Sequence, residues 1–166
     1  MYTTITKKLQ KFTFFLLILT LAGCLKSDSK QLQSQKAFFV SRVIDGDTIE
    51  LSTGKRIRYI GIDTPEVRKK TAGSWQYDPK PYSLEASNYN KSLVEGKEVI
   101  LEFDVEKQDK YSRWLAYVYK DGKMVNEELL KQGYAKVLVI PPNTKYRSRL
   151  NIAQTEAQQA HRGLWK

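Results

Sequence analysis

Two acidic side chains, Asp63 and Glu66, follow an apolar segment in the sequence IGIDTPE at 60–66. A third acid, Asp47, opens the segment TIEL after the turn sequence Ile-Asp-Gly. If these segments form neighbouring strands, the ends that carry Asp47 and Asp63 can meet. Together with a backbone carbonyl at Thr64, such carboxylates form an all-oxygen site that suits Ca²⁺, with waters completing the shell. The alternative is that these acids are ordinary turn and capping residues.

Two arginines add the chemistry of phosphate binding. Strand alternation would place Arg58 on the same side as Ile60 and Ile62, where a solvated charge is not expected. Arg113 follows the loop EKQDKYS at 106–112. Two guanidinium groups facing a carboxylate-held cation suit a phosphodiester, whose negative charge grows as water attacks phosphorus. Structural ion pairing remains the alternative for either arginine.

The elements that must position these residues are short strands followed by helices. Apolar alternation and turn signals predict strands at 38–44, 48–51, 56–62, 99–103 and 113–119. Helical patterns cover 83–94, the segment VNEELLKQG and 145–160, and a polar stretch with Gly73, Pro79 and Pro81 precedes the first of them. In VNEELLKQG, Asn126 is a candidate N-cap and Gly133 a candidate C-cap. Five short strands with late helices favour a small barrel of the OB type, in an α+β, mainly β protein.

The N-terminus has the pattern of an export signal. Three lysines precede the apolar run 12–21, which is short for a membrane span and ends in Leu-Ala-Gly-Cys. This pattern resembles the bacterial lipoprotein signal, so we expect residues 1–23 to be removed and Cys24 to be lipidated. Residues 24–36 would be a flexible tether, and 37–166 a single domain. The protein would then be exported and anchored to a membrane on its extracytoplasmic side, with a shed form and an uncleaved anchor helix as open alternatives.

Composition narrows the partners. The formal charge is +10, from 28 basic and 18 acidic residues, which favours polyanions such as nucleic acid or anionic lipid. If Cys24 is lipidated, no thiol is left for a disulfide or a thiolate metal site. The single histidine, His161, lies in the basic tail HRGLWK, so sites that need a histidine pair are disfavoured. Nothing in the sequence demands more than a monomer.

Four stretches carry a family resemblance. VIDGDTIEL, RIRYIGIDTPE, DKYSRWLAYVY and DGKMVNEELLKQGYAKV resemble, in this order and spacing, the staphylococcal nuclease (thermonuclease) family over 38–166. The resemblance implies an OB-fold enzyme that uses Ca²⁺ to hydrolyse DNA and RNA, leaving 3′-phosphate and 5′-hydroxyl ends. We expect single-stranded nucleic acid or a breathing duplex to be the favoured substrate.

The resemblance also implies three groups of site residues. The Ca²⁺ ligands would be Asp47, Asp63 and the backbone carbonyl of Thr64. The catalytic residues would be Arg58, Glu66 and Arg113. The residues that bind a terminal phosphate would be Lys110 and Tyr111. Glu66 would be the general base close to the metal, and the two arginines would stabilise the transition state.

Some positions depart from the family pattern. Ser112 and Ser83 stand where glycine is usual, and serine adds roughly 1 to 2 kcal/mol of strain wherever φ is positive. The segment VLVIPP after Lys136 lacks the tyrosines that pack against a bound nucleotide in the best-known member. Two other functions therefore stay open. One is an OB-fold lipoprotein that binds single-stranded nucleic acid with weak or no catalysis, and the other is a structural envelope lipoprotein that contacts anionic lipid or wall polymer.

Overall fold

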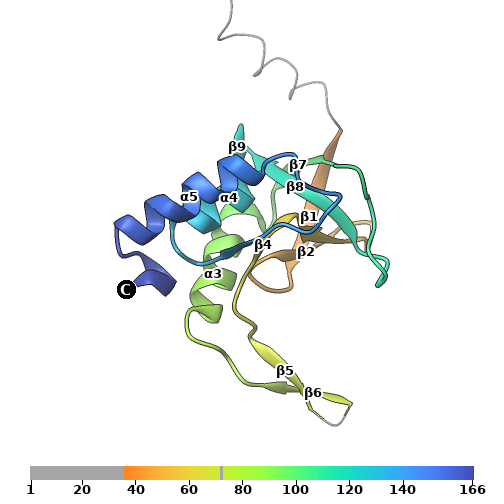
Figure 1. Ribbon diagram of the computed structural model, residues 1–166. Coiled ribbons are helices and arrows are strands. Elements are labelled where there is room, and N and C mark those ends of the chain that lie inside the picture. Colours follow the sequence, from red (N-terminus) through yellow and green to blue (C-terminus); the bar gives the residue numbers. More distant parts are fainter. Residues whose placement is uncertain (1–35, 72) are drawn as a thin grey trace, which may run out of the picture. The chain divides into compact units, whose positions relative to one another are not determined.

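The chain forms a barrel of five strands (Figure 1). The computed structural model describes residues 36–71 and 73–166. The barrel strands are β1 (Ala37–Val43), β2 (Thr48–Leu51), β3 (Arg56–Tyr59), β7 (Glu98–Glu102) and β8 (Trp114–Lys120). They lie in the order β3-β2-β1-β7-β8, and a parallel pairing of β3 with β8 closes the barrel. The short strand β9 (Lys123–Met124) pairs with β8 in antiparallel orientation. The predicted OB-type, five-stranded barrel in an α+β protein is confirmed.

Apolar side chains fill the interior of the barrel. Val40, Ile49, Ile57 and Val118, from four different strands, have no exposed surface. β-Branched residues fit the pleated surface of a sheet, and burying each such side chain contributes roughly 1.5 to 3 kcal/mol. The described residues contain no cysteine, so the apolar core alone holds this part of the chain together.

Three α-helices lie beside the barrel in the part of the chain that the structure describes. They are α3 (Ser83–Val94), α4 (Val125–Lys131) and α5 (Arg147–Gln159). Helix α4 contacts both α3 and α5, and a 3₁₀ turn, η2 (Gly163–Trp165), follows α5. Helix α3 has the predicted bounds, and α5 is slightly shorter than predicted at both ends.

The sequence predicted Asn126 as the N-cap of α4, and this prediction is wrong, because Met124 is the N-cap. The helix begins at Val125, and Asn126 is fully buried inside it. Its side-chain oxygen accepts a hydrogen bond from the Val118 N–H (2.9 Å), and its Nδ2 donates one to the Ile60 carbonyl (2.9 Å). Buried backbone groups need partners, and Asn126 supplies them where the strands leave two groups unpaired. The C-cap of the helix is Gln132 rather than the predicted Gly133, and Gly133 is the next residue, with the positive φ (+71°) that commonly ends a helix.

The strand predicted at 56–62 is broken. After β3 the chain turns at Ile60, and a separate strand, β4 (Gly61–Asp63), pairs with β10 (Lys136–Leu138), which was not predicted. Gly61 has φ +81°, which favours glycine, and a Cβ there would collide with Leu150. The alternation used to place Arg58 therefore does not continue past Ile60.

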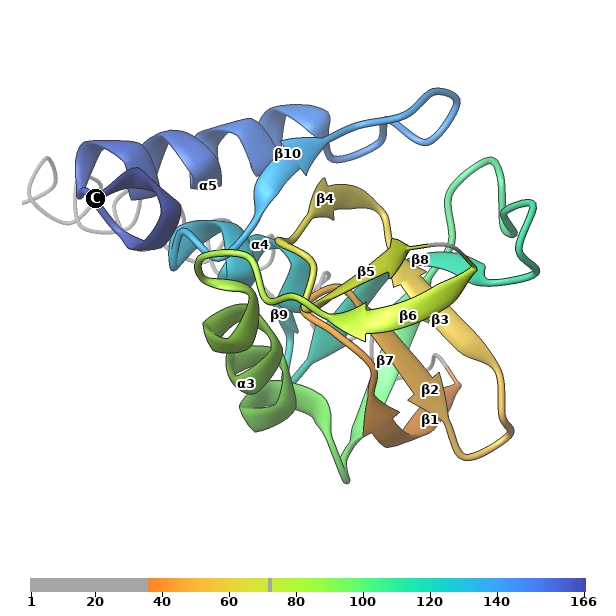
Figure 2. The ribbon, with the colours of Figure 1, turned by 90° about the horizontal axis from the view of Figure 1, so that it is seen from below.

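A hairpin occupies the polar stretch before α3. Its strands are β5 (Arg68–Thr71) and β6 (Ser74–Tyr77), which pair only with each other among the described strands. It projects away from the barrel in Figure 1 and lies in front of it in Figure 2, which is seen from below. The sequence did not predict these two strands.

Part of the sequence interpretation concerns residues that the structure does not describe. The export signal at 1–23, the lipidated Cys24 and all of the tether except Lys36 lie outside the described residues. Within the described part, none of the helices combines the length and apolar character that crossing a bilayer requires. Residues 36–166 form one compact unit.

Candidate active site

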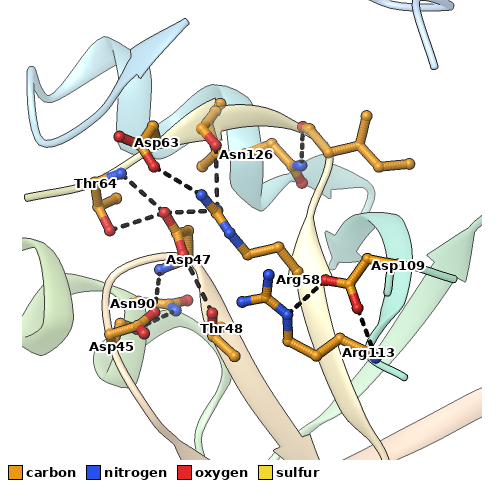
Figure 3. A network of polar contacts seen from close by, with 12 residues as sticks. Asp45, Asp47, Thr48, Arg58, Asp63, Thr64, Asn90, Asp109, Arg113 and Asn126 are labelled. Atoms are coloured by element: carbon orange, nitrogen blue, oxygen red, sulfur yellow. Dashed lines mark hydrogen bonds and ion pairs between the residues drawn. The ribbon is translucent and has the colours of Figure 1, made fainter. Parts of the chain in front are cut away.

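Asp47 is the buried centre of a polar cluster at one end of the barrel (Figure 3). The turn before β2 fixes its backbone, because the Asp45 carboxylate accepts a hydrogen bond from the Asp47 N–H (3.0 Å). Its Oδ2 accepts hydrogen bonds from the Thr64 N–H (2.8 Å) and hydroxyl (3.0 Å), and lies 2.6 Å from Nη1 of Arg58. Burial raises the pKa of Asp47 to about 7, although the Arg58 guanidinium acts in the opposite direction.

Arg58 joins the two predicted metal-binding carboxylates. One end of its guanidinium contacts Asp47, and Nη2 donates a hydrogen bond to Oδ1 of Asp63 (2.8 Å). Nη1 also donates to the Ile62 carbonyl (3.2 Å), and the side chain is only 16% exposed. The start of β2, the middle of β3 and the end of β4 thus meet at one guanidinium, which holds Asp47 and Asp63 on the same side of the barrel.

Two residues that the sequence interpretation missed support this cluster. Asn90 of α3 is fully buried, donates a hydrogen bond from Nδ2 to the Asp45 carbonyl (3.1 Å), and accepts one from the Tyr59 hydroxyl (2.9 Å). Burial raises the pKa of Tyr59, so the phenol stays a neutral donor. Asn90 stands between Ala86 and Val94 at helical spacing, and an amide in the middle of an apolar stripe was the signal that could have identified it.

Glu66 lies at the exposed edge of the same cluster. Partial burial raises its pKa, the charges of Asp47 and Asp63 raise it further, and Arg58 and Arg113 lower it. All four charged groups are therefore close enough to act on Glu66. Its backbone is also held, because the Lys80 N–H donates to the Glu66 carbonyl (3.0 Å).

Arg113 stands at the end of a loop that precedes β8. Its Nε donates a hydrogen bond to Oδ2 of Asp109 (2.7 Å), while Oδ1 of Asp109 accepts the backbone N–H groups of Arg113 (3.0 Å) and Tyr111 (2.9 Å). Partial burial favours the neutral form of Asp109, but these hydrogen bonds outweigh it and lower the pKa. Asp109 was part of the quoted loop but was not identified as the residue that positions Arg113.

Lys110 and Tyr111 lie at the exposed end of this loop. The Tyr111 side chain is 68% exposed, with Nζ of Lys110 at 5.2 Å and Cζ of Arg113 at 5.6 Å from its ring centre. These distances allow cation–π attraction. The loop thus presents an aromatic ring and two cations to solvent beside the polar cluster.

The two serines that replace usual glycines behave differently. Ser112 has φ +64°, so the strain expected at this position is present. Near Ser83 the positive φ belongs to Tyr82 (+65°), and Ser83 is the first residue of α3. The Ser83 hydroxyl is buried and has no hydrogen-bond partner within the described chain.

The oxygen donors fit a hard cation in chemistry, although the cluster is small. No group of three or more His, Cys, Asp or Glu side chains in residues 36–71 and 73–166 is arranged to hold a metal ion. The donors at hand are the carboxylates of Asp47 and Asp63 and the carbonyl of Thr64, which leaves several positions for water. Burial, with a smaller contribution from neighbouring carboxylates, raises the pKa values of Asp47 and Glu66, and a divalent cation nearby would favour their charged forms.

A barrel of the OB type with two arginines and three carboxylates at one end is suited to binding and attacking a phosphate ester. A family model described as "Staphylococcal nuclease homologue" matches residues 56–166. The chain belongs to this family.

Named relatives cover most of the chain. It is 40% identical over 147 residues to a thermonuclease of Staphylococcus intermedius, which covers 87% of this chain and 84% of that protein. It is 38% identical over 150 residues to a thermonuclease of Staphylococcus hyicus, covering 89% of this chain and 86% of that protein. It is also 44% identical over 131 residues to the endonuclease YncB of Bacillus subtilis, covering 76% of this chain and 60% of that protein. The prediction that the chain is an enzyme is confirmed by these relatives.

Proposed function

We propose that this protein is a Ca²⁺-dependent, sugar-nonspecific nuclease that hydrolyses phosphodiester bonds of DNA and RNA to give 3′-phosphate and 5′-hydroxyl ends. The observation that carries the proposal is the joint contact of Arg58 with Asp47 and Asp63, beside Glu66 and Arg113. Membership of the nuclease family supports the same reaction.

The two arginines bind the phosphodiester and stabilise its developing charge. A guanidinium offers two parallel donors to phosphoryl oxygens, and such donors matter most where the charge grows in the transition state. Arg113 is 30% exposed and so is accessible to a substrate. Arg58 would reach the phosphate from the buried side of the cluster.

Asp47, Asp63 and the Thr64 carbonyl would hold Ca²⁺. When bound, the cation supplies positive charge that stabilises the phosphoryl oxygens and polarises a water molecule. The contribution of the chain is to hold its two carboxylates in place: hydrogen bonds from Thr64 hold Asp47, and the Arg58 guanidinium holds Asp63.

Glu66 would act as the general base. It lies two residues after Thr64 and is exposed, so a water molecule can lie between it and the bound phosphate. The carboxylate would take the proton of the attacking water as the bond between phosphorus and the 5′ oxygen breaks, and the leaving 5′ oxygen would take a proton from solvent. Lys110 and Tyr111, at the exposed end of their loop, would bind a terminal phosphate.

The experiment that tests this function compares heat-denatured DNA and RNA in millimolar Ca²⁺ and in excess chelator, with analysis of the product ends. We expect cleavage of both substrates only with Ca²⁺, and 3′-phosphate ends. Intact substrates under both conditions would contradict the proposal.

Glu66→Gln tests the general base within that assay. The amide has nearly the same shape and cannot accept the proton, so activity should fall by about 10² to 10⁴ while the fold is kept. Glu85→Gln, at an exposed position of α3, is the matched control and should cleave like the wild type. A folded Glu66→Gln protein with normal turnover excludes Glu66 as the base.

A second candidate function is a nucleic-acid-binding lipoprotein with weak or no catalysis. It is favoured by Ser112, whose positive φ strains the loop that carries Arg113. Salt-sensitive binding of single strands without cleavage would support it.

The proposed location is the extracytoplasmic face of a membrane, with the lipid on Cys24 as anchor and a monomeric enzyme domain. The proposal rests on the sequence of the N-terminal signal. Its test is Cys24→Ala, which should move the protein from the membrane fraction to the soluble fraction without changing the rate of cleavage.

A further inference from the structure

The hairpin β5–β6 carries two large aromatic side chains that the described chain leaves uncovered. Trp75 is 65% exposed and Tyr77 is 68% exposed. Burying an aromatic side chain is strongly favourable, so neighbouring exposed aromatic residues mark a surface that binds something. The hairpin pairs with no other described strand, so neither of its faces is part of the core.

The register of the hairpin places basic and aromatic residues together. Arg68 lies opposite Tyr77, and Lys69 lies opposite Gln76. Alternate residues of a strand share a face, so Trp75 and Tyr77 lie on one face with Arg68, and Lys69 lies on the other. Residues 67–80 contain four basic residues and one acid, which makes the hairpin attractive to a polyanion.

The root of the hairpin is bonded directly to the candidate active site. The Asp78 N–H donates to the Val67 carbonyl (3.1 Å), and the Lys80 N–H donates to the Glu66 carbonyl (3.0 Å). The pairing of the two strands therefore continues down to Glu66. Arg68 is only two residues away, or about 7 Å along an extended chain.

We propose that the face formed by Arg68, Trp75 and Tyr77 is a stacking platform for the unpaired bases of the nucleic-acid strand being cleaved. This inference rests on the proposed nuclease function and assigns residues of the hairpin to the binding of a single strand. Every base has a π-face, so stacking on Trp75 and Tyr77 tolerates any sequence. The Arg68 guanidinium binds a backbone phosphate beside them. Bases in a duplex are already stacked on one another and offer the platform little.

The hairpin itself gains from this partner. An isolated two-stranded hairpin is at best marginally stable in water. Thr71, Ser74 and Gln76 are exposed, as are the aromatic residues, so the hairpin buries little of its own surface. A nucleic-acid strand bound across Trp75 and Tyr77 would cover that face of the hairpin and supply the missing packing.

A membrane surface is the competing partner for such a hairpin, because tryptophan and tyrosine also settle at lipid headgroups. The hydrogen bonds to the Glu66 and Val67 backbone favour nucleic acid, since they place the platform beside the phosphate-binding groups rather than at a remote surface. If the partner were a membrane, loss of Trp75 and Tyr77 would weaken binding to lipid vesicles instead.

The first test measures binding of full-length protein, in chelator, to a fluorescent single-stranded oligonucleotide of mixed sequence and to the duplex of equal length. Trp75→Ala and Tyr77→Ala should each weaken single-strand binding by roughly 5- to 150-fold. Duplex binding should change less than twofold, and Trp75→Phe should retain most of the single-strand affinity. Ile152→Ala, at a position 70% exposed on α5, is the matched control and should bind like the wild type.

The second test separates stacking from charge. Arg68→Gln should reduce the slope of log affinity against log salt by about 0.7 for a single strand, because it removes one phosphate contact. Lys69→Gln, on the other face of the hairpin, is the matched control and should leave the slope nearly unchanged. Trp75→Ala should lower affinity and leave this slope unchanged, since it removes no charge.

Three results would overturn the inference. They are single-strand binding that survives loss of both aromatic residues, equal losses for single strand and duplex, and, when vesicles that contain anionic phospholipid are assayed in parallel, a loss of binding confined to the vesicles. Because binding is measured in chelator, the outcome is independent of cleavage. Binding that depends on Trp75 in a protein that never cleaves refutes only the nuclease function, and normal cleavage with unaffected binding refutes only the platform.

Discussion

The two arginines of the candidate site are held in different ways. Arg58 is 16% exposed and contacts Asp47 and Asp63, which come from two other strands or their ends. Arg113 is 30% exposed and is held by Asp109, four residues earlier in its own loop. One arginine is therefore fixed by the fold of the barrel, and the other by a local turn that can adjust without disturbing the core.

The carboxylates beside the two arginines differ in the same way. Burial raises the pKa of Asp47 to about 7, and the neighbouring Arg58 and the hydrogen bonds from Thr64 limit this rise. Hydrogen bonds to Asp109 outweigh its partial burial and lower its pKa, so it is ionised throughout the neutral range. The comparison indicates that Arg58 has a structural role besides the catalytic one proposed for it, whereas Arg113 has little structural role.

The largest expected effect is on catalysis. Arg58→Lys should lower kcat by about 10² to 10³, because an ammonium cannot reproduce two parallel donors to a phosphoryl group. The control is Arg56→Lys in the same strand, where the arginine is 57% exposed and pairs with Glu50. Steady-state cleavage of denatured DNA checks both variants. Equal rates for the two would show that the buried arginine has no special part.

The next effect is on stability and separates the two arginines. Arg58→Met leaves the buried Asp47 without its cation and should cost about 3 to 5 kcal/mol of unfolding free energy, whereas Arg113→Met should cost less than about 1 kcal/mol. Urea unfolding at pH 8 measures both. Similar losses of unfolding free energy for the two variants would show that the two arginines do not differ in structural role.

The pH dependence of the Arg58→Met loss has a definite sign. Without Arg58 the pKa of Asp47 rises further above its unfolded value, so the folded protein binds a proton below that pKa. The stability lost in Arg58→Met should therefore be smaller at pH 5 than at pH 8. A larger loss of stability at pH 5 than at pH 8 would contradict a buried Asp47 carboxyl with a raised pKa.

A smaller effect is expected from Asp109→Asn. The amide cannot hold the guanidinium as firmly, so Arg113 loses its orientation and kcat should fall roughly 10-fold, since small misplacements of a catalytic group reduce the rate. Stability should change by less than about 1 kcal/mol, because the pair is partly exposed. Asp121→Asn, at a position 79% exposed, is the control and should leave kcat unchanged.

The smallest effect concerns the loop that carries Arg113. Ser112→Gly removes a side chain from a position with φ +64° and should raise the free energy of unfolding by about 1 kcal/mol. Chemical denaturation checks this value. A decrease in stability would show that the serine hydroxyl contributes more than the strain removes.

Much of the barrel was predictable because its strands are short apolar segments bounded by turn residues. The segment TIEL and the helix at 83–94 were predicted with the bounds found in the structure, since apolar spacing and turn residues mark both. The hairpin β5–β6 was missed because its residues are exposed on both faces and so show no contrast between a buried and a solvated side. The strand β10 was missed because it has only three residues, two of them exposed.

The site was predictable in its charged residues and not in their supports. Asp47 and Asp63 were found because a charge at a strand end needs an explanation, and Arg58 because a charge that alternates with apolar residues does too. Asp109 and Asn90 act only through hydrogen bonds to other site residues, and those pairings depend on the folded chain. Asn126 was assigned to a cap because its sequence position fits one, but contacts with two distant backbone groups decide its place.

The pairing of β4 with β10 has a consequence for the order in which the site is made. Asp63 lies opposite Lys136, which is far along the sequence. Arg58 lies opposite Thr48, the residue after Asp47, and β2 and β3 are joined by a short turn. Contacts between distant segments form late, because closing a long loop costs more entropy than closing a short one. A chain still emerging from the ribosome can therefore pair β2 with β3 early, but the strand that carries Asp63 lacks its partner until residue 138 has been synthesised.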